Sequence, residues 1–542
     1  MALLAVREFV ENNTVGPQLL FPQSRNYRMG VQIDHLTQHA ENIGDRIAVI
    51  DDRGNSAPRH VSYVAFNDAV NALANGFLSL GSGEGSHIAW WGNNSLEILT
   101  AIHAIRKSGG VSIPIPYKST SDEAQYLLQA ADVEILLIEN QYLPILEPIR
   151  DDLKSLKHVV SFGDNLINSE SIPMGDVLGS STKPVTEGNY ASTQQMIFTS
   201  GTTGKPKGAI RKVGGEANQF GPLFKLIGWD RMDQLIYLTT GPLYHSGPLG
   251  FTLRSQLVGS TVVTQHSFDP EDWLRLVDSH RVTSTFSAPT PMRRITALPD
   301  DIKSKYDVSS LECFIANAAP WTMKLKRAYL HDFREDSLWE IYGSTELSVC
   351  TVLAPEDQLR KPGSCGVPAP GVSIKIFDDD GEEISEPDVP GELYAKSVAV
   401  FDTYYKSHDQ YLEDHRDGYQ TVGDIAYVDD EGYYFICDRK KDMIITGGVN
   451  VYPAEIENVL DDHPQVAEVA VLGIPDEEWG EAVCAIIVPL EGLEEINIME
   501  FARNRLSGPK VPKQIFFYPE LPKTGSGKVL KRDLREQVLK NL

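Results

Sequence analysis

A ten-residue segment from Thr199 to Gly208 concentrates groups that bind phosphate. Four hydroxyl side chains, three glycines and two lysines follow the apolar run 196–198. Such a loop can surround phosphate oxygens with backbone N–H groups, hydroxyls and ammonium groups together. The Walker A pattern does not align to it, and a flexible polar loop is the alternative; the density of suitable groups favours nucleotide binding. The candidate residues are Thr199, Ser200, Gly201, Thr202, Thr203, Gly204, Lys205 and Lys207.

A second segment, Tyr342-Gly343-Ser344-Thr345-Glu346, places an aromatic ring, two hydroxyls and a carboxylate after apolar residues. The ring can lie against a nucleotide base. Glu346 can bind Mg²⁺, which needs hard oxygen ligands and takes few of them from protein. A strand end with a capping Thr and Glu has the same sequence, so the residues alone leave both interpretations open.

Three further positions carry isolated charged or titratable side chains. Asp424 follows a glycine and Arg439 lies close behind it, which suits a ribose, although an Asp after Gly is more often a turn residue. The glycine-containing segment 521–528 includes Lys528 and lies at a locally basic end of the chain. This end could bind a polyanion, and the alternative is a solvated terminal helix with an ordinary lysine. His245 lies beside apolar residues, where a histidine is usually structural.

Composition narrows the class of protein. The chain has 542 residues and a formal net charge of -26, which argues against a nucleic-acid partner because phosphate backbones need clustered cations. The five cysteines form no CxxC pair, so neither a disulfide framework nor a zinc site is indicated. The N-terminal apolar run is too short for a signal peptide, and no apolar stretch has the length to span a bilayer. These features predict an enzyme of the reducing cytoplasm.

Short apolar runs alternate with helical patterns over most of the chain and must position these groups. Runs typical of buried strands are 87–91, 133–138, 235–238, 260–264 and 283–287, with a helix at 96–106. This alternation predicts parallel sheets covered by helices on both faces. From about Gly366 to Val422, short strands between turns predict a small antiparallel unit. The charge run 438–442 is typical of a surface turn and also suits a linker, and a compact α+β unit follows it.

Taken together, these segments resemble the adenylate-forming superfamily of acyl-CoA synthetases, luciferases and peptide-synthetase adenylation domains. The resemblance runs from about residue 30 to the end, through the motifs TSGTTGKPKG, YGSTE, GDIAYVDDEGYYFICDRKKDMIITGGVNVYPAEIE and LPKTGSGK. It implies an α/β N-terminal domain, 1–438, of two packed α/β subdomains plus a small β-barrel. A hinge, 439–442, and a small mobile α+β C-terminal domain, 443–542, would follow.

The resemblance implies roles in the ATP-dependent step. Residues 199–208 would hold the β- and γ-phosphates and later pyrophosphate. Tyr342 would stack on adenine, Thr345 would contact the α-phosphate and Glu346 would bind Mg²⁺. His245 would lie beside the acyl site and the thiol entrance.

It also implies a division of work between the two domains. Asp424 and Arg439 would hold the ribose, and Lys528 would bridge the substrate carboxylate and the α-phosphate. Lys441 matches the hinge that lets the C-terminal domain turn between two half-reactions. The residues that would line the tunnel for the pantetheine arm are Gly447 and Gly448.

One segment departs from the family pattern. The glycine-alanine-proline segment expected beside adenine appears here as Asn317-Ala318-Ala319-Pro320, followed by Trp321. Ala318 adds a Cβ where glycine would permit close approach of the nucleotide. This change predicts a narrower adenine slot, and it leaves open an enzyme that mainly uses acyl-adenylate already made.

The leading hypothesis is an ATP-dependent acyl-CoA ligase that uses a small carboxylic acid, ATP, Mg²⁺ and coenzyme A and releases AMP and pyrophosphate. Transfer to a carrier-protein phosphopantetheine is an alternative, and a non-catalytic protein that binds nucleotide or acyl-adenylate is another. The sequence names neither the acid nor the oligomeric state, which leaves a homodimer open.

Overall fold

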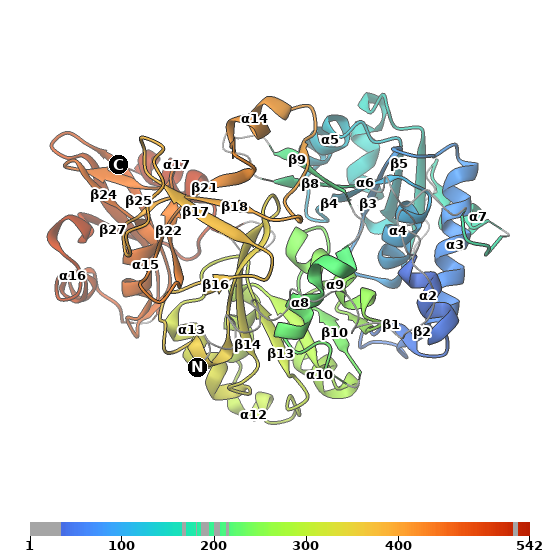
Figure 1. The fold of residues 1–542 in the computed structure, drawn as a ribbon, viewed down its shortest axis with the longest axis horizontal. Coiled ribbons are helices and arrows are strands. Elements are labelled where there is room, and N and C mark those ends of the chain that lie inside the picture. The colour runs from blue at the N-terminus through green and yellow to red at the C-terminus, as the bar shows by residue number, and fades with distance from the viewer. Residues whose placement is uncertain are drawn as a thin grey trace.

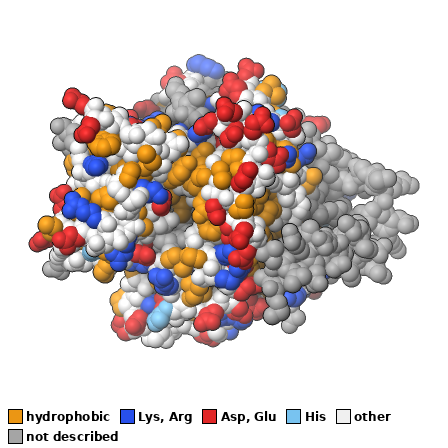
Figure 2. Space-filling view, turned by 60° about the vertical axis from the view of Figure 1, so that its left-hand side comes forward, with side chains coloured by type: hydrophobic (Ala, Val, Ile, Leu, Met, Phe, Trp, Pro, Cys, Tyr) orange, Lys and Arg blue, Asp and Glu red, His pale blue; other side chains and the backbone are white. Residues whose placement is uncertain are grey.

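Four β-sheets with helices around and between them make up the part of the chain that the computed structural model describes (Figure 1). That part comprises residues 34–164, 170–179, 181–185, 194–199, 206–212, 216–232, 234–490, 492–523 and 529–541. The C-terminal elements lie at one end of the molecule and the first helices at the other (Figure 1). Acidic and basic side chains are interspersed with hydrophobic ones on the face shown in Figure 2. The mixed α/β architecture confirms the predicted fold class.

The largest sheet has nine strands. Its central pairings are parallel, and both edges are antiparallel. In spatial order the strands are β16 (Val367–Pro368), β15 (Ser348–Leu353), β14 (Leu338–Ser344), β13 (Cys313–Ala316), β12 (Ser284–Ser287), β10 (Ile236–Thr239), β11 (Thr261–Thr264), β1 (Ile47–Asp51) and β2 (Arg59–Ser62).

Helices cover both faces of this sheet, because successive side chains of each strand point to opposite sides. Cys313 and Ile315 of β13 pack with residues of α8 and α9 on one side. Phe314 and Ala316 pack with residues of α10, α11 and α13 on the other. The helices are α8 (Glu216–Leu226), α9 (Ser246–Leu257), α10 (Pro270–His280), α11 (Pro289–Thr296), α12 (Asp300–Lys303) and α13 (Met323–Asp332).

The second sheet has eight strands, and helices cover both of its faces as well. Ile88 and Trp90 of β3 pack against one helical layer, and Ala89 and Trp91 pack against the other. Its strands in order are β19 (Thr403–Tyr404), β9 (Lys207–Lys212), β8 (Gln194–Thr199), β4 (Val111–Ile115), β3 (His87–Trp91), β5 (Ile135–Glu139), β6 (His158–Phe162) and β7 (Ile172–Pro173). The helices that the structure describes between residues 34 and 179 are α2 (His35–Asn42), α3 (Tyr63–Ser79), α4 (Leu96–Lys107), α5 (Ser121–Ala130), α6 (Leu143–Leu146) and α7 (Met174–Val177).

One hydrophobic core joins the two sheets. It contains residues of α3, α4 and β3 from the second subdomain together with Leu249, Leu253 and Val262 from the first. Helix α9 therefore contributes to the contact between the subdomains, and its N-terminal end is fixed at their junction.

A five-stranded antiparallel sheet follows, and it extends beyond the predicted end at Val422. The turn 429–433 returns the chain as β22, which pairs with β21 up to Arg439. Its elements are β17 (Ser373–Phe377), β18 (Gly391–Lys396), β20 (His415–Arg416), β21 (Tyr419–Val428) and β22 (Tyr434–Arg439), with α14 (His408–Glu413) before β20. The charge run 438–442 thus begins inside a strand, and its exposed part, Lys440 and Lys441, follows the strand end.

The last sheet forms the C-terminal α+β unit that the sequence predicts. Its strands are β23 (Ile444–Thr446), β24 (Val449–Val451), β25 (Val466–Asp476), β26 (Gly480–Pro489) and β27 (Gln514–Phe517), with helices α15 (Pro453–Asp461), α16 (Glu495–Arg503) and α17 (Lys531–Asn541). Lys324 of α13 holds this unit against the larger part by donating to the carbonyl oxygens of Asp461 at 3.3 Å and Val466 at 2.8 Å. Arg293 lies 3.5 Å from the Asp461 carboxylate.

Candidate active site

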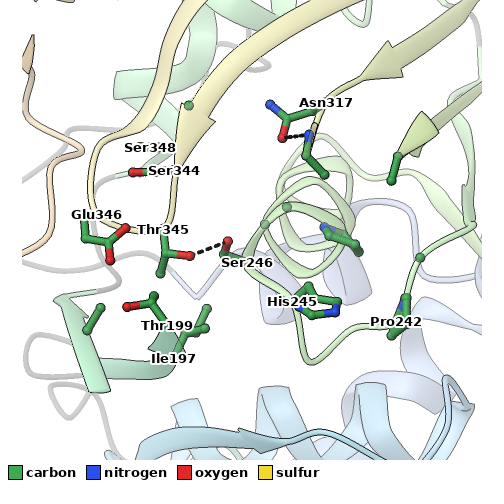
Figure 3. Close-up of a pocket in the computed structure, with 18 of the residues that line it drawn as sticks. Ile197, Thr199, Pro242, His245, Ser246, Asn317, Ser344, Thr345, Glu346 and Ser348 are labelled. Carbon is green, nitrogen blue, oxygen red and sulfur yellow. Dashed lines mark hydrogen bonds between the residues drawn. The ribbon is translucent and has the colours of Figure 1, made fainter. Parts of the chain in front are cut away.

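A cavity of about 740 Å³ lies where the two large sheets, the antiparallel sheet and the C-terminal unit meet (Figure 3). Pro248, Phe251 and Phe286 give it an apolar part, and hydroxyl and charged side chains line the rest. Sequence-predicted residues on its wall are Thr199, Lys207, His245, Ala318, Gly343, Ser344, Thr345, Glu346 and Arg439. One cavity therefore collects groups from motifs that lie far apart in the sequence.

The predicted phosphate-binding segment begins and ends at this cavity. Thr199 is the last residue of β8 and Lys207 is the first of β9, and the two are paired in register across the antiparallel strands. Both line the cavity, and Lys207 Nζ donates to Gln410 Oε1 at 3.2 Å. The last residue of β8 and the first residue of β9 therefore both face the cavity. The residues Ser200, Gly201, Thr202, Thr203, Gly204 and Lys205 lie outside the described residues.

The YGSTE segment forms the end of β14 and the turn into β15. The turn is tight at Gly343, where a Cβ would lie 1.9 Å from the carbonyl oxygen of Ser348, so only glycine fits. The hydroxyls of Thr345 and Ser246 form a 2.8 Å hydrogen bond across the cavity wall (Figure 3). Arg211 of β9 donates to the Thr345 carbonyl at 2.6 Å. These contacts fix the segment between both large sheets.

Glu346 is suited to a metal ligand. Its side chain faces the cavity, and the residue is 8% exposed (Figure 3). Tyr404 of β19 donates its hydroxyl to Glu346 Oε1 at 3.1 Å, which orients the carboxylate. A hard carboxylate oxygen beside the hydroxyls of Thr345 and Ser344 fits Mg²⁺, which prefers oxygen ligands and keeps several waters.

Asp424 and Arg439 form an ion pair between two adjacent antiparallel strands. They are partners on β21 and β22, and Arg439 Nε lies 3.0 Å from Asp424 Oδ1. Tyr342 donates its hydroxyl to Asp424 Oδ2 at 2.5 Å. Burial, and then the Asp424 charge, raise the pKa of Tyr342 well above its usual value. The cavity lining includes Arg439 but neither Tyr342 nor Asp424, so the adenine-stacking role of Tyr342 stays a prediction.

The altered segment 317–320 lies at the same cavity, with Asn317 and Ala318 on its wall. Ala318 has a φ of 76°, in the left-handed region that favours glycine. The Asn317 amide donates to the Ile341 carbonyl, and its oxygen accepts from Ala318 N–H, which locks the turn. Trp321 is 4% exposed and packs in the core against Phe314, with ring centroids 5.5 Å apart. Ala319 and Pro320 complete the turn before it.

His245 is the N-cap residue of α9 and lines the cavity (Figure 3). Its ring lies 4.3 Å, centroid to centroid, from that of the buried Tyr244. Ser246, the next residue, makes the bond to Thr345. His245 therefore lies beside the hydroxyl cluster and the apolar part of the cavity, and its role at an acyl site stays a prediction.

Among the described residues of the C-terminal unit, Lys523 is the one that lines the cavity. Lys523 lines the cavity, and its Nζ lies 2.5 Å from Glu468 Oε1. Lys523 also forms an antiparallel bridge with Val529. Lys528 itself lies outside the described residues.

The remaining predicted residues lie beyond the cavity. Lys441 is exposed in the turn between β22 and β23. Gly447 and Gly448 connect β23 to β24, with φ values of 58° and 79° that a two-residue hairpin of this type requires. A Cβ on Gly447 would lie 2.7 Å from the Trp479 ring, so the turn packs against that side chain.

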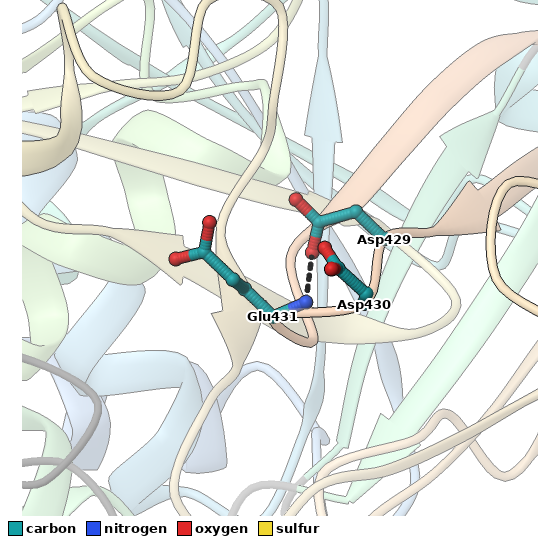
Figure 4. Close-up of side chains that lie close together, drawn as sticks. All are labelled: Asp429, Asp430 and Glu431. Atoms are coloured by element: carbon teal, nitrogen blue, oxygen red, sulfur yellow. Dashed lines mark hydrogen bonds between the residues drawn. The ribbon is translucent and has the colours of Figure 1, made fainter.

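An acidic turn, Asp429-Asp430-Glu431, is the one group in the described part of the chain whose carboxylates lie close enough to share a metal ion (Figure 4). Two of its three carboxylates, Asp429 and Glu431, are already paired with cations. Lys361 Nζ lies 2.7 Å from Asp429 and 2.5 Å from Glu431, and Arg360 contacts Glu431 at 2.7 Å. We interpret it as an ion-paired turn. None of the described helices is both long enough and apolar enough to cross a membrane.

Several residues at the site carry no sequence signal. Tyr404, Gln410 and Arg211 come from segments without a recognisable motif, yet each contacts a predicted residue. The packing of β19, α14 and β9 at the cavity brings these three residues there.

Comparison with known proteins agrees with this geometry. Residues 36–405 match the family model described as AMP-binding enzyme, and residues 455–528 match its C-terminal domain. The indoleacetate–CoA ligase of Aromatoleum aromaticum is 33% identical over 498 residues, 89% of this chain and 94% of that protein. The 2-succinylbenzoate–CoA ligase of Bacillus cytotoxicus is 30% identical over 92% of this chain and 98% of its own.

Solved structures are similar along almost the whole length. ATP-bound MatB from Rhodopseudomonas palustris has a TM-score of 0.81 at 26% identity, covering 93% of this chain and 99% of that one. MenE from Bacillus subtilis, with its acyl-adenylate intermediate OSB-AMP, has a TM-score of 0.79 at 25% identity, covering 94% and 99%. The chain belongs to the family of AMP-binding, adenylate-forming enzymes.

Proposed function

We propose that the protein is an AMP-forming acid–thiol ligase that makes acyl-CoA thioesters. A carboxylate oxygen attacks the α-phosphorus of ATP, and pyrophosphate leaves. The CoA sulfur then attacks the carbonyl carbon of the acyl-adenylate, its proton is lost to solvent, and AMP leaves. Relatives named as indoleacetate–CoA and 2-succinylbenzoate–CoA ligases support this reaction and favour free CoA over a carrier protein.

The observation that carries the proposal is the single cavity shared by phosphate-compatible groups and an apolar wall. Lys207 and Arg439 supply positive charge, Glu346 supplies a carboxylate, and Phe286 belongs to the apolar part. Attack of a carboxylate on ATP brings anions together, so cations placed in advance stabilise the transition state more than the reactants. In a chain of net charge -26 these local cations are needed to hold two anionic substrates.

We assign the residues as follows. The segment 199–208 holds the β- and γ-phosphates, and Thr345 contacts the α-phosphate. Glu346 carries Mg²⁺, which when bound offsets charge on the phosphate oxygens. The Asp424–Arg439 pair faces the ribose. Lys528 enters the cavity and bridges the substrate carboxylate and the α-phosphate; the proximity of Lys523 to the cavity supports this assignment.

The second half-reaction needs a different arrangement, because a lysine that covers the carbonyl blocks the thiol. We propose that the C-terminal domain, 443–542, turns about residues 439–442, with Lys441 absorbing the backbone rotation. Gly447 and Gly448 then line the pantetheine path. A homodimer and a cytoplasmic location stay predictions from the sequence.

The test combines two assays on the purified protein. ATP–pyrophosphate exchange with a panel of acids, without CoA, measures adenylate formation, and the full mixture should yield AMP and thioester in equal amounts. Release of ADP, or silence of both assays with every acid, would contradict the proposal. Thioester formation from supplied acyl-adenylate without any exchange would instead indicate an enzyme of the second half-reaction alone.

A further inference from the structure

The wall of the cavity formed by α9 carries a cation that the proposed reaction does not use. Arg254 lines the cavity and is 7% exposed. Its guanidinium carbon lies 4.0 Å from the ring centroid of Phe220 and 5.5 Å from that of Phe251. Arginine keeps its charge in such surroundings and stacks on aromatic faces. A buried guanidinium is stabilised by oxygen acceptors, and its five donors are enough to take one from a ligand in the cavity in addition to its contacts with the protein.

The position of this guanidinium along α9 follows from one close approach. A Cβ built on Gly250 would lie 2.6 Å from Arg254 Nη1, so the guanidinium lies beside Gly250. Long helical side chains lean toward the N-terminus in this way. Ser246, bonded to Thr345, marks the reacting end of the cavity. From Ser246 to Gly250 the helix rises about 6 Å, so the guanidinium lies about that far beyond the reacting end.

The space between these two points has an aromatic wall. A Cβ on Gly247 would lie 2.5 Å from Phe286 Cζ, so this ring packs directly on the helix. Phe286 stacks with Phe251, with centroids 5.5 Å apart and an interplanar angle of 23°. Flat apolar groups pack well against such a surface.

We propose that the acid substrate carries a second oxygen acceptor about 6 Å from its reacting carboxyl group, a distance equal to the helix rise from Ser246 to Gly250. Arg254 binds this acceptor and thereby determines which acids the enzyme prefers. The inference rests on the ligase function proposed above. A guanidinium has five donors, so it binds a ligand oxygen while keeping contacts with the protein. The preferred class is short acids with a hydroxyl, keto or carboxylate group at the far end, in place of long unsubstituted fatty acids.

Pairs of acids that differ only in the far acceptor test the proposal in the pyrophosphate-exchange assay. Suitable sets are benzoate with 4-hydroxybenzoate and terephthalate, and hexanoate with adipate. In the wild type, kcat/KM should be higher for the acceptor-bearing acid by at least about tenfold, the size of a hydrogen bond to a charged group. Arg254→Met should abolish this preference, and Arg254→Lys should keep part of it.

A matched control is the second arginine on the wall. Arg294 lines the same cavity but is exposed, and its guanidinium carbon lies 5.1 Å from the ring centroid of Phe268. The variant Arg294→Met should therefore keep the wild-type preference for acids with the far acceptor. Equal kcat/KM for both members of every pair would overturn the inference, as would a preference that survives Arg254→Met. If Arg254→Met does not fold, the inference is tested by the kcat/KM ratios of the wild type and of Arg254→Lys. No exchange with any acid would overturn the proposed function together with this inference, whereas exchange without preference overturns the inference alone.

Discussion

Replacing Ala318 by glycine should stabilise the protein, because the backbone at this position adopts a conformation that alanine resists. Its φ is 76°, and a left-handed residue with a Cβ costs roughly 1–2 kcal/mol. Glycine removes that cost but gains freedom in the unfolded chain, which returns about 0.4–1 kcal/mol. The expected net gain in the free energy of unfolding is about 0.8 kcal/mol, the difference between the midpoints of these two ranges.

The neighbouring Ala319 supplies a matched control, since its φ is not in the left-handed region. Ala319→Gly gains only unfolded-state freedom and should lose about 0.4–1 kcal/mol. Chemical denaturation of both variants measures the difference, and the KM for ATP in pyrophosphate exchange reports on the cavity wall that Ala318 forms. We expect that KM to fall in Ala318→Gly because the Cβ is lost. Equal destabilisation by the two substitutions would refute the strain argument, and an unchanged KM would refute the narrowed slot.

Two further outcomes follow from single contacts. Tyr404→Phe removes the hydroxyl that orients Glu346. The Mg²⁺ concentration that gives half-maximal pyrophosphate exchange should therefore rise about tenfold, as is typical when a contact that supports a metal ligand is lost. A Mg²⁺ titration that matches the wild type would contradict this. Burial raises the pKa of Asp52, but hydrogen bonds from Arg275 and His280 outweigh it and lower the pKa to about 2. The folded-state pKa is thus below the unfolded one, so this stabilisation is present above about pH 4 and is lost as the pH falls toward 2. Asp52→Asn should flatten the stability–pH curve in that window, and a curve of unchanged slope would count against it.

Much of the fold was predictable because it depends on local periodicity. The run 87–91 became β3 with both faces buried, as a parallel strand requires. The helix predicted at 96–106 became α4, begun by the Ser95 cap. The antiparallel sheet was predicted too short, because its last strand returns through a turn at 429–433 and ends inside the charge run.

The site was predictable only where motifs carry it. Glu346 and Arg439 could be named from sequence, but the hydroxyl of Tyr404 contacts Glu346 from a residue 58 positions away. Arg254 likewise gives no signal, because a lone arginine in a helix is usually solvated, and its burial depends on the packing of α8 and α9. Contacts between distant segments follow from tertiary packing, which the sequence pattern does not encode locally.

The most direct test of the account is to measure both half-reactions in Lys528→Ala, with Lys510→Ala as a control at a surface lysine paired to Glu455. If the C-terminal lysine serves only adenylation, pyrophosphate exchange should fall by at least about a hundredfold, as when a preorganised charge is removed. Thioester formation from supplied acyl-adenylate and CoA should stay near the wild-type rate, and the control should retain both activities. Equal loss of the two activities in Lys528→Ala would contradict the account.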